Sequence, residues 1–93
     1  MSLYLKDPQG SLDYTIDWAA GYLSGQSVVT SLWSVQPAEA DGLVIAATIH
    51  DGARTAATLG GGVAGHVYRV TNHVVLSDGR ADERSLAIRV EQR

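Results

Sequence analysis

Residues 60–90 read GGGVAGHVYRVTNHVVLSDGRADERSLAIRV, and this stretch decides the fold class. A glycine-rich turn leads into a run that alternates apolar and polar residues, and a second alternating run follows the pair Asp78-Gly79. Alternation with a period of two places successive side chains on opposite faces of a strand, and Asp-Gly is typical of a tight turn between strands. The stretch is therefore predicted to form a β-hairpin.

One face of this hairpin is expected to form part of the core. Arg84 and Arg89 are expected in water or across from acidic side chains, and Tyr68 is expected near a sheet corner, as in a tyrosine corner. The residues assigned to the inward face are Tyr68, Val70, Asn72, Val74, Leu86, Ile88 and Val90.

A second alternating segment lies near the N-terminus. Residues 12–18 alternate large apolar side chains with polar ones, which predicts a strand with one buried face. Residues 19–25 break this alternation. Gly21 and Gly25 predict a turn that places Tyr22 or Leu23 over the end of a sheet.

The alternation resumes in residues 27–35. There Val29, Trp33 and Val35 share the face that we assign to the core, while Leu32 on the other face is expected to be partly exposed. This segment is predicted to be a further strand.

The middle of the chain predicts two more strands. Residues 37–42 hold Pro, Asp and Gly and favour a turn, with a single helical turn as the alternative. Residues 43–49 and 54–59 are the predicted strands, and His50-Asp51-Gly52-Ala53 between them suits a hairpin turn.

This pattern of short strands and frequent turns predicts an all-β fold. An immunoglobulin-like (Ig-like) antiparallel β-sandwich of about six or seven strands fits the length best. Residues 1–93 are expected to form a single domain, with residues 1–10 as a loosely ordered N-terminal arm. Apolar residues make up 45% of the chain, which is enough for one core, and the absence of cysteine excludes disulfides and thiol chemistry.

The charge distribution argues against nucleic acid as a partner. Residues 1–53 hold six acidic residues and Lys6 as their only Lys or Arg, whereas residues 54–93 hold six Arg and four acidic residues. Neither half supplies a continuous basic surface. The first residues show no secretory signal, and the charge-free run 19–38 is too interrupted to span a membrane, so no membrane partner is expected.

The side chains that usually carry chemistry form no recognisable catalytic or metal-binding motif. The chain's three histidines, His50, His66 and His73, are not spaced as i, i+2 or i, i+4 pairs, and no G-x-S-x-G motif is present. Asp13 and Asp17 would lie about 13 Å apart along a strand, farther than the roughly 5 to 9.5 Å of paired glycosidase carboxylates. We therefore expect no catalytic residue, no metal, no cofactor and no enzymatic activity.

Two further motifs are better explained by structure than by ligand binding. Gly60-Gly61-Gly62 lacks the Lys-Ser/Thr pair and the following helix of a phosphate-binding loop, so it is interpreted as a flexible or tight loop. Trp18 and Trp33 fall on inward faces and are assigned to the core rather than to sugar-stacking platforms.

The dense run of charges around the Asp78-Gly79 turn is the one surface feature that suggests a partner. Opposite charges there could pair across strands or dock against complementary charges on another protein. The candidate docking residues are Asp78, Arg80, Asp82, Glu83 and Arg84.

Four motifs, in this order and spacing, resemble a family of small proteins encoded among the structural genes of tailed bacteriophages and prophages. These proteins are described as fiber-tail adaptor or virion-associated Ig-like proteins. Glu39-Ala40-Asp41 and the stretch 50–57 follow no recognised family pattern. The motifs are Lys6-Asp7-Pro8 before residues 12–18, then 30–35 (TSLWSV), then 61–65 (GGVAG) with 68–72 (YRVTN), and finally 79–86 (GRADERSL).

The resemblance implies a non-enzymatic structural adaptor of a phage or prophage-derived particle that acts by protein–protein docking. It implies no cofactor, other phage structural proteins as partners, and a location in the virion or in the host cytoplasm during assembly. A homo-oligomer or ring on assembly stays open. The alternative is a carbohydrate- or surface-binding Ig-like module, which the sandwich pattern and the two Trp and four Tyr would allow.

Overall fold

The structure, a computed structural model, describes residues 2–20 and 25–92 of the 93-residue chain. These residues form seven strands and one short 3₁₀ helix. Among them no helix is long and apolar enough to cross a membrane. The elements are β1 (Ser2–Lys6), β2 (Ser11–Asp17), the 3₁₀ helix η1 (Trp18–Ala20), β3 (Val28–Gln36), β4 (Leu43–His50), β5 (Arg54–Gly61), β6 (Val67–Leu76) and β7 (Ala81–Val90).

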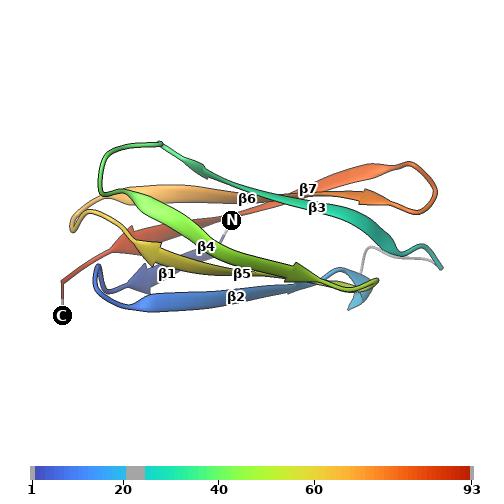
Figure 1. Cartoon of the computed structure of the whole chain (residues 1–93), viewed down its shortest axis with the longest axis horizontal. Coiled ribbons are helices and arrows are strands. Elements are labelled where there is room, and N and C mark those ends of the chain that lie inside the picture. Colours follow the sequence, from blue (N-terminus) through green and yellow to red (C-terminus); the bar gives the residue numbers. More distant parts are fainter. Residues whose placement is uncertain (1, 21–24, 93) are drawn as a thin grey trace.

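The strands are arranged in two sheets that pack face to face (Figure 1). One sheet has the order β1-β7-β6-β3 and the other the order β2-β5-β4. Neighbouring strands are antiparallel except β1 and β7, which run parallel. The predicted all-β sandwich is confirmed, and it is elongated, with extents of 42 × 21 × 20 Å.

The N-terminal segment differs from the expected loose arm. Residues Ser2–Lys6 pair with Leu86–Val90 along one edge of the four-stranded sheet. Lys6 is only 4% exposed, and its ammonium donates hydrogen bonds to the carbonyl oxygens of Asp7 and Gly61 at 2.8 and 2.7 Å. Burial lowers the pKa of Lys6. The segment is ordered because β7 supplies main-chain partners and Lys6 ties it to β5 in the opposite sheet.

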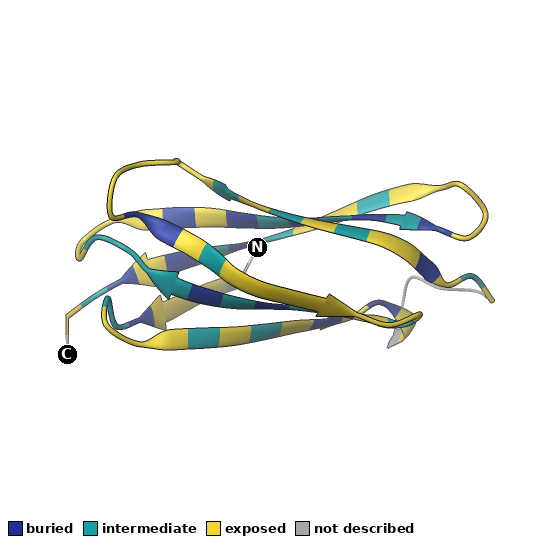
Figure 2. Cartoon of the chain, viewed as in Figure 1, coloured by how far each residue is buried: buried dark blue, intermediate teal, exposed yellow. Residues whose placement is uncertain are grey.

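The core lies between the two sheets, and the inward face predicted for the hairpin is confirmed. In Figure 2, dark blue buried positions alternate with intermediate or exposed ones along β6 and along the second half of β7. The larger cluster consists of Leu43, Ala57, Leu59, Tyr68, Val70, Leu86, Ile88 and Val90. The smaller one consists of Ile16, Trp18, Val28, Val74 and Leu76.

The predicted inward face of β3 is correct at its C-terminal half and wrong at its start. Trp33 is half-buried and packs against both clusters, and Leu32 is 65% exposed as expected. Val29 is 58% exposed, because a β-bulge between Val28 and Thr30 shifts the alternation and places Val28 inside instead.

The turn and strand predictions for the middle of the chain are confirmed. Residues 37–42 form a turn rather than a helical turn, and the peptide bond before Pro37 is cis. The β4–β5 hairpin turns at residues 51–53. The prediction about Tyr22 and Leu23 concerns residues outside the described part of the chain.

Candidate docking site

The tip of the β6–β7 hairpin forms one end of the long axis of the sandwich (Figure 1). The Leu76 N–H donates to the Arg80 carbonyl at 2.7 Å, and the Gly79 N–H donates to the Leu76 carbonyl at 2.9 Å. Gly79 has φ 87°, a left-handed conformation that glycine adopts without a steric cost. The predicted Asp78-Gly79 turn is therefore present.

The Asp78 side chain fixes the conformation of this turn. The Asp78 carboxylate accepts hydrogen bonds from the Arg80 main-chain N–H at 3.0 Å, the Gln26 amide at 3.1 Å and the Arg80 guanidinium at 3.1 Å. The Arg80 N–H is the largest of the causes that lower the pKa of Asp78, followed by the Gln26 amide. A carboxylate held by three donors gives the tip a defined shape before any partner arrives.

The segment before β3 braces the same tip. The Ser27 N–H donates to the Ser77 hydroxyl at 3.0 Å, and the Ser77 N–H donates to the Ser27 carbonyl at 2.8 Å. Reciprocal hydrogen bonds thus connect the end of the hairpin to the segment before β3.

The remaining candidate residues lie on the first half of β7 and point to two different faces. Glu83 is on the outer face, where its carboxylate pairs with His73 of β6 at 3.0 Å. Asp82 and Arg84 stand opposite the buried residues Val74 and Asn72, so they lie on the inner face at the edge of the sheet. The structure thus brings all five predicted residues to one end but divides them between the turn and the two faces of β7.

Arg84 lies near the aromatic side chains that close this edge of the core. Burial raises the pKa of Tyr14, the neighbouring Tyr4 hydroxyl raises it further, and the charge of Arg84 acts in the opposite direction. The rings of Tyr4 and Tyr14 meet edge to face with centroids 5.2 Å apart. The alternation from Arg84 through Leu86 to Ile88 could have indicated this inward position.

The opposite end of the sandwich holds a polar cluster around Tyr68, whose place at a sheet corner was predicted, whereas its contact with Glu39 was not. The buried Tyr68 hydroxyl accepts the Val63 N–H at 3.0 Å and donates to the Glu39 carboxylate, which His66 also contacts at 2.8 Å. This is the arrangement of a tyrosine corner. The Tyr68 hydroxyl, followed by His66, lowers the pKa of Glu39, while burial, followed by Glu39, raises the pKa of Tyr68. Glu39 lies in a stretch whose sequence follows no recognised family pattern, so the sequence did not indicate its contact with Tyr68.

The tryptophans do not offer flat exposed platforms. Trp18 has 0% exposure, and its indole N–H donates to Thr55 at 3.0 Å and to Asn72 at 3.2 Å. Trp33 packs edge to face against Tyr14 with ring centroids 6.4 Å apart. Both side chains therefore serve the core, as the sequence predicted.

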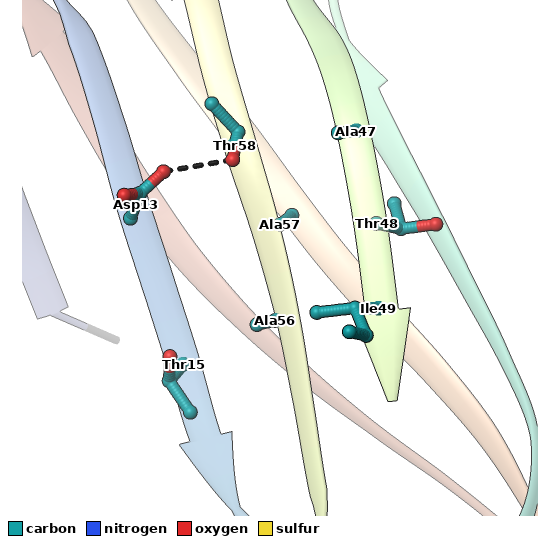
Figure 3. A pocket seen from close by; sticks show the side chains of 8 residues that line it. All are labelled: Asp13, Thr15, Ala47, Thr48, Ile49, Ala56, Ala57 and Thr58. Carbon is teal, nitrogen blue, oxygen red and sulfur yellow. Dashed lines mark hydrogen bonds between the residues drawn. The ribbon is translucent and has the colours of Figure 1, made fainter. Parts of the chain in front are cut away.

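A shallow hollow of about 300 Å³ lies on the outer face of the three-stranded sheet (Figure 3). Asp13 is its single carboxylate, and it accepts the Thr58 hydroxyl at 2.7 Å. The lining residues are Asp13, Thr15, Ala47, Thr48, Ile49, Ala56, Ala57 and Thr58. This lining has no imidazole that could activate a hydroxyl group and no thiol that could act as a nucleophile.

The loop predicted for the glycine triplet is wrong for Gly60 and Gly61, which lie in a strand, and only Gly62 lies outside it. Gly62 has φ 105°, and a Cβ atom there would lie 2.6 Å from a methyl group of Val90. Gly60 and Gly61 belong to β5. Within the described residues, no three His, Cys, Asp or Glu side chains are grouped to hold a metal ion.

The fold defines the class of protein as an Ig-like β-sandwich. The solution structure of the PKD domain from the KIAA 1837 protein is similar to this chain, with a TM-score of 0.59 and 16% identity over 99% of this chain and 80% of that chain. At this identity the likeness concerns the fold alone.

The sequence identifies the family to which the chain belongs. Residues 6–89 match the family described as Podophage GP4 fiber-tail adaptor protein gp77, and the chain belongs to this family. A search of curated proteins found no match. The chain is thus a structural adaptor of the podophage virion tail, with other phage structural proteins as partners, and it is not an enzyme. This confirms the adaptor hypothesis over the carbohydrate- or surface-binding module.

Proposed function

We propose that this adaptor joins tail and fiber parts as a rigid sandwich and that its charged tip is one of the docking surfaces. The charged tip consists of Asp78, Arg80, Asp82, Glu83 and Arg84. The observation that supports the proposal most is the position of this set at one end of a molecule 42 Å long, where the turn is held by hydrogen bonds. A preformed surface loses little conformational entropy on docking.

The chemistry of the charged tip favours a partner with its own charges of both signs. Arg80 is 73% exposed and pairs with Asp78, and Glu83 is 63% exposed and pairs with His73. Exposed pairs of this kind contribute only about 0.2 to 1 kcal/mol each, so docking needs several complementary contacts together. Complementary charges also raise the rate of association and reject wrong partners.

Arg80→Glu tests the docking surface without touching the core. The probe is the set of particles that the source phage assembles when the gene for this chain is deleted, and the readout is binding of the purified chain to them. We expect the substitution to weaken binding by about tenfold or more, because a repulsive contact replaces an attractive one. Arg69→Glu is the matched control, because Arg69 is exposed on the outer face of β6 and away from the tip.

The variants must be compared as folded proteins. Thermal unfolding should give midpoints close to that of the wild-type chain for both variants, since both side chains are exposed and the surface pair of Arg80 and Asp78 contributes only about 0.2 to 1 kcal/mol. Equal binding of Arg80→Glu and the wild-type chain would contradict the proposed docking surface, and a loss of binding with Arg69→Glu alone would move that surface to the sheet face.

We also propose that the chain acts through contacts with proteins and does not bind nucleic acid. We further propose that it forms a homo-oligomer on assembly and that it joins the particle from the host cytoplasm. The charge split between residues 1–53 and 54–93 supports contacts between copies and gives nucleic acid no continuous basic surface. Fluorescence anisotropy with labelled duplex DNA checks the first point, and binding that persists at about 0.1 M salt would contradict it.

A further inference from the structure

The outer face of the three-stranded sheet is uncovered in the described part of the chain. In Figure 1, β2, β5 and β4 lie in front, and no other described segment crosses them. Directly opposite residues of neighbouring strands point to the same face, so the register defines two outward rows that run across the strands. The Ile49 row is Thr15, Ala56 and Ile49, and the Asp13 row is Asp13, Thr58 and Ala47.

This face has a projecting apolar side chain beside a hollow. Ile49 is 74% exposed, the largest exposed fraction among the large hydrophobic side chains of the described residues. Figure 3 shows it extending from β4 toward β5, whereas Ala47 on the same strand contributes only a methyl group. The hollow of about 300 Å³ lies between the two rows, and a second hollow of about 160 Å³ is also lined by Ile49 and Ala56. The projection and the hollow thus belong to one surface.

A surface that holds both a projection and a hollow can pack against a copy of itself. If a second copy packs face to face about a two-fold axis that crosses the strands between the two rows, the Ile49 row of each copy lies over the Asp13 row of the other. Ile49 then lies over Ala47 of the other copy, so the bulkiest apolar side chain of the two rows meets one of the smallest. Each copy supplies one projection and one hollow, as a two-fold contact requires.

The polar groups of this face also fit a second copy. Within the two rows only Asp13 is charged, and it would lie over Thr15 of the other copy. One Asp13 oxygen accepts the Thr58 hydroxyl at 2.7 Å, and the other oxygen can accept a hydrogen bond from that Thr15 hydroxyl. No like charges meet, because the next outward charged residues would lie over uncharged ones, Asp17 over Ser11 and Arg54 over Gly60.

We propose that the outer face of the three-stranded sheet is a contact between two copies of this chain, in which Ile49 of each copy enters the hollow of the other. The second copy is the occupant that the surface favours, because it brings both the apolar side chain for the hollow and a donor for Asp13. The outer face of the other sheet is less suited, since Arg89 stands between Leu5 and Val67 there. This contact rests on the homo-oligomer proposed above and specifies its surface.

The size of the face predicts weak association. Three strands at a spacing of ~4.8 Å and seven residues at ~3.3 Å each cover roughly 14 × 23 Å per copy. This is less than the roughly 800 Å² per partner of a standard stable interface, so the dimer should form only at high concentration, as on a particle. Because the contact is mainly apolar, added salt should not weaken it, whereas salt should weaken docking through the charged tip.

Exchanging the projection and the hollow tests the contact directly. Analytical ultracentrifugation of the purified chain up to about 1 mM should show a monomer–dimer equilibrium. Ile49→Ala leaves a gap and Ala47→Ile an overlap in both halves of the contact, so each variant alone should dimerise at least about tenfold more weakly. Both positions are exposed, so neither change touches the core.

An equal mixture of the two variants should form heterodimers. The side chain added at position 47 of one variant fills the space left at position 49 of the other, and the unchanged Ile49 and Ala47 meet as before. The double variant Ile49→Ala/Ala47→Ile should form homodimers again for the same reason. Leu32→Ala is the matched control, because Leu32 is 65% exposed on the outer face of the other sheet, and it should associate like the wild-type chain.

Several results would overturn the proposal. They are a wild-type chain that stays monomeric up to about 1 mM, single variants that dimerise like the wild type, and a mixture that fails to associate although circular dichroism shows both variants folded. If Ile49→Ala instead loses binding to the particles while its self-association is unchanged, a tail protein covers this face and a second copy does not. Tail docking through the tip is measured separately with Arg80→Glu. A chain that dimerises through this face but whose tail binding is insensitive to Arg80→Glu supports this contact and contradicts the tip as the tail contact.

Discussion

At the scale of single residues, Asn72 is the centre of the polar contacts inside the core. Its side-chain oxygen accepts hydrogen bonds from Thr55 at 2.6 Å and Trp18 at 3.2 Å, and its amide nitrogen donates to Ser31 at 2.9 Å. These bonds join both sheets, because Thr55 belongs to β5 and Ser31 to β3. A buried amide with partners on both sides stabilises one register of the two sheets.

Asn72→Ala should lower the free energy of unfolding by about 1 to 3 kcal/mol, because it leaves buried donors without their acceptor. Urea unfolding measures the change. Ser34→Ala, at an exposed position of the neighbouring strand β3, is the control and should have little effect. Equal losses for the two variants would contradict the importance of the Asn72 contacts.

Glu39 gives the chain a pH-dependent contribution to stability. Because its pKa is lowered in the folded chain, the ionised carboxylate stabilises the fold above its ordinary pKa, and this contribution is lost as the pH falls through the lowered value. Tyr68→Phe removes the larger cause of the lowering. Between neutral and acidic pH, unfolding midpoints of Tyr68→Phe should therefore fall less steeply than those of the wild-type chain. If the unfolding midpoints of Tyr68→Phe and of the wild-type chain fall equally steeply with pH, the Tyr68 contact does not act on Glu39.

At the scale of elements, the inward faces of strands with strict alternation were predictable, whereas the inward face of β3 was predictable only away from its bulge. The alternation in β2, β6 and β7 predicts their faces, because each has one side against the core. β1 has three apolar residues in a row, so its sequence does not indicate which face of the strand is buried. Its ordered conformation depends on its pairing with β7. The bulge at Val29 arises from the register in which β3 pairs with β6, and the sequence of β3 alone does not indicate this register.

Lys6 is the side chain that we expect to hold β1 in place. Lys6→Met keeps most of the buried stem but removes the donor to the carbonyl oxygens of Asp7 and Gly61. We predict a loss of about 1 to 3 kcal/mol in local stability, seen as faster hydrogen exchange of the amides of residues 2–6. Leu3→Met, at a side chain that is 60% exposed, should leave the exchange rates nearly unchanged. Equal exchange in both variants would refute this role of Lys6.

At the scale of the whole molecule, the charged tip was predictable because its residues are adjacent in sequence. Its division between the turn and two faces of β7 was not, since this depends on the pairing of Asp82 and Arg84 with positions on β6. Glu39, Tyr68 and His66 come from separate loops and a strand, so only the fold brings them together at the opposite end. Contacts between distant residues were thus the part that sequence patterns did not supply.

Site-specific cross-linking on the assembled particle tests the central claim most directly. The chain has no cysteine, so Arg80→Cys and Arg69→Cys each provide a single attachment point for a photo-activated cross-linker. If the charged tip docks onto the tail or fiber, the label at position 80 should give a cross-link to a tail or fiber protein in purified particles, and the label at position 69 should give much less. Cross-links to those proteins from position 69 but not from position 80 would contradict the account.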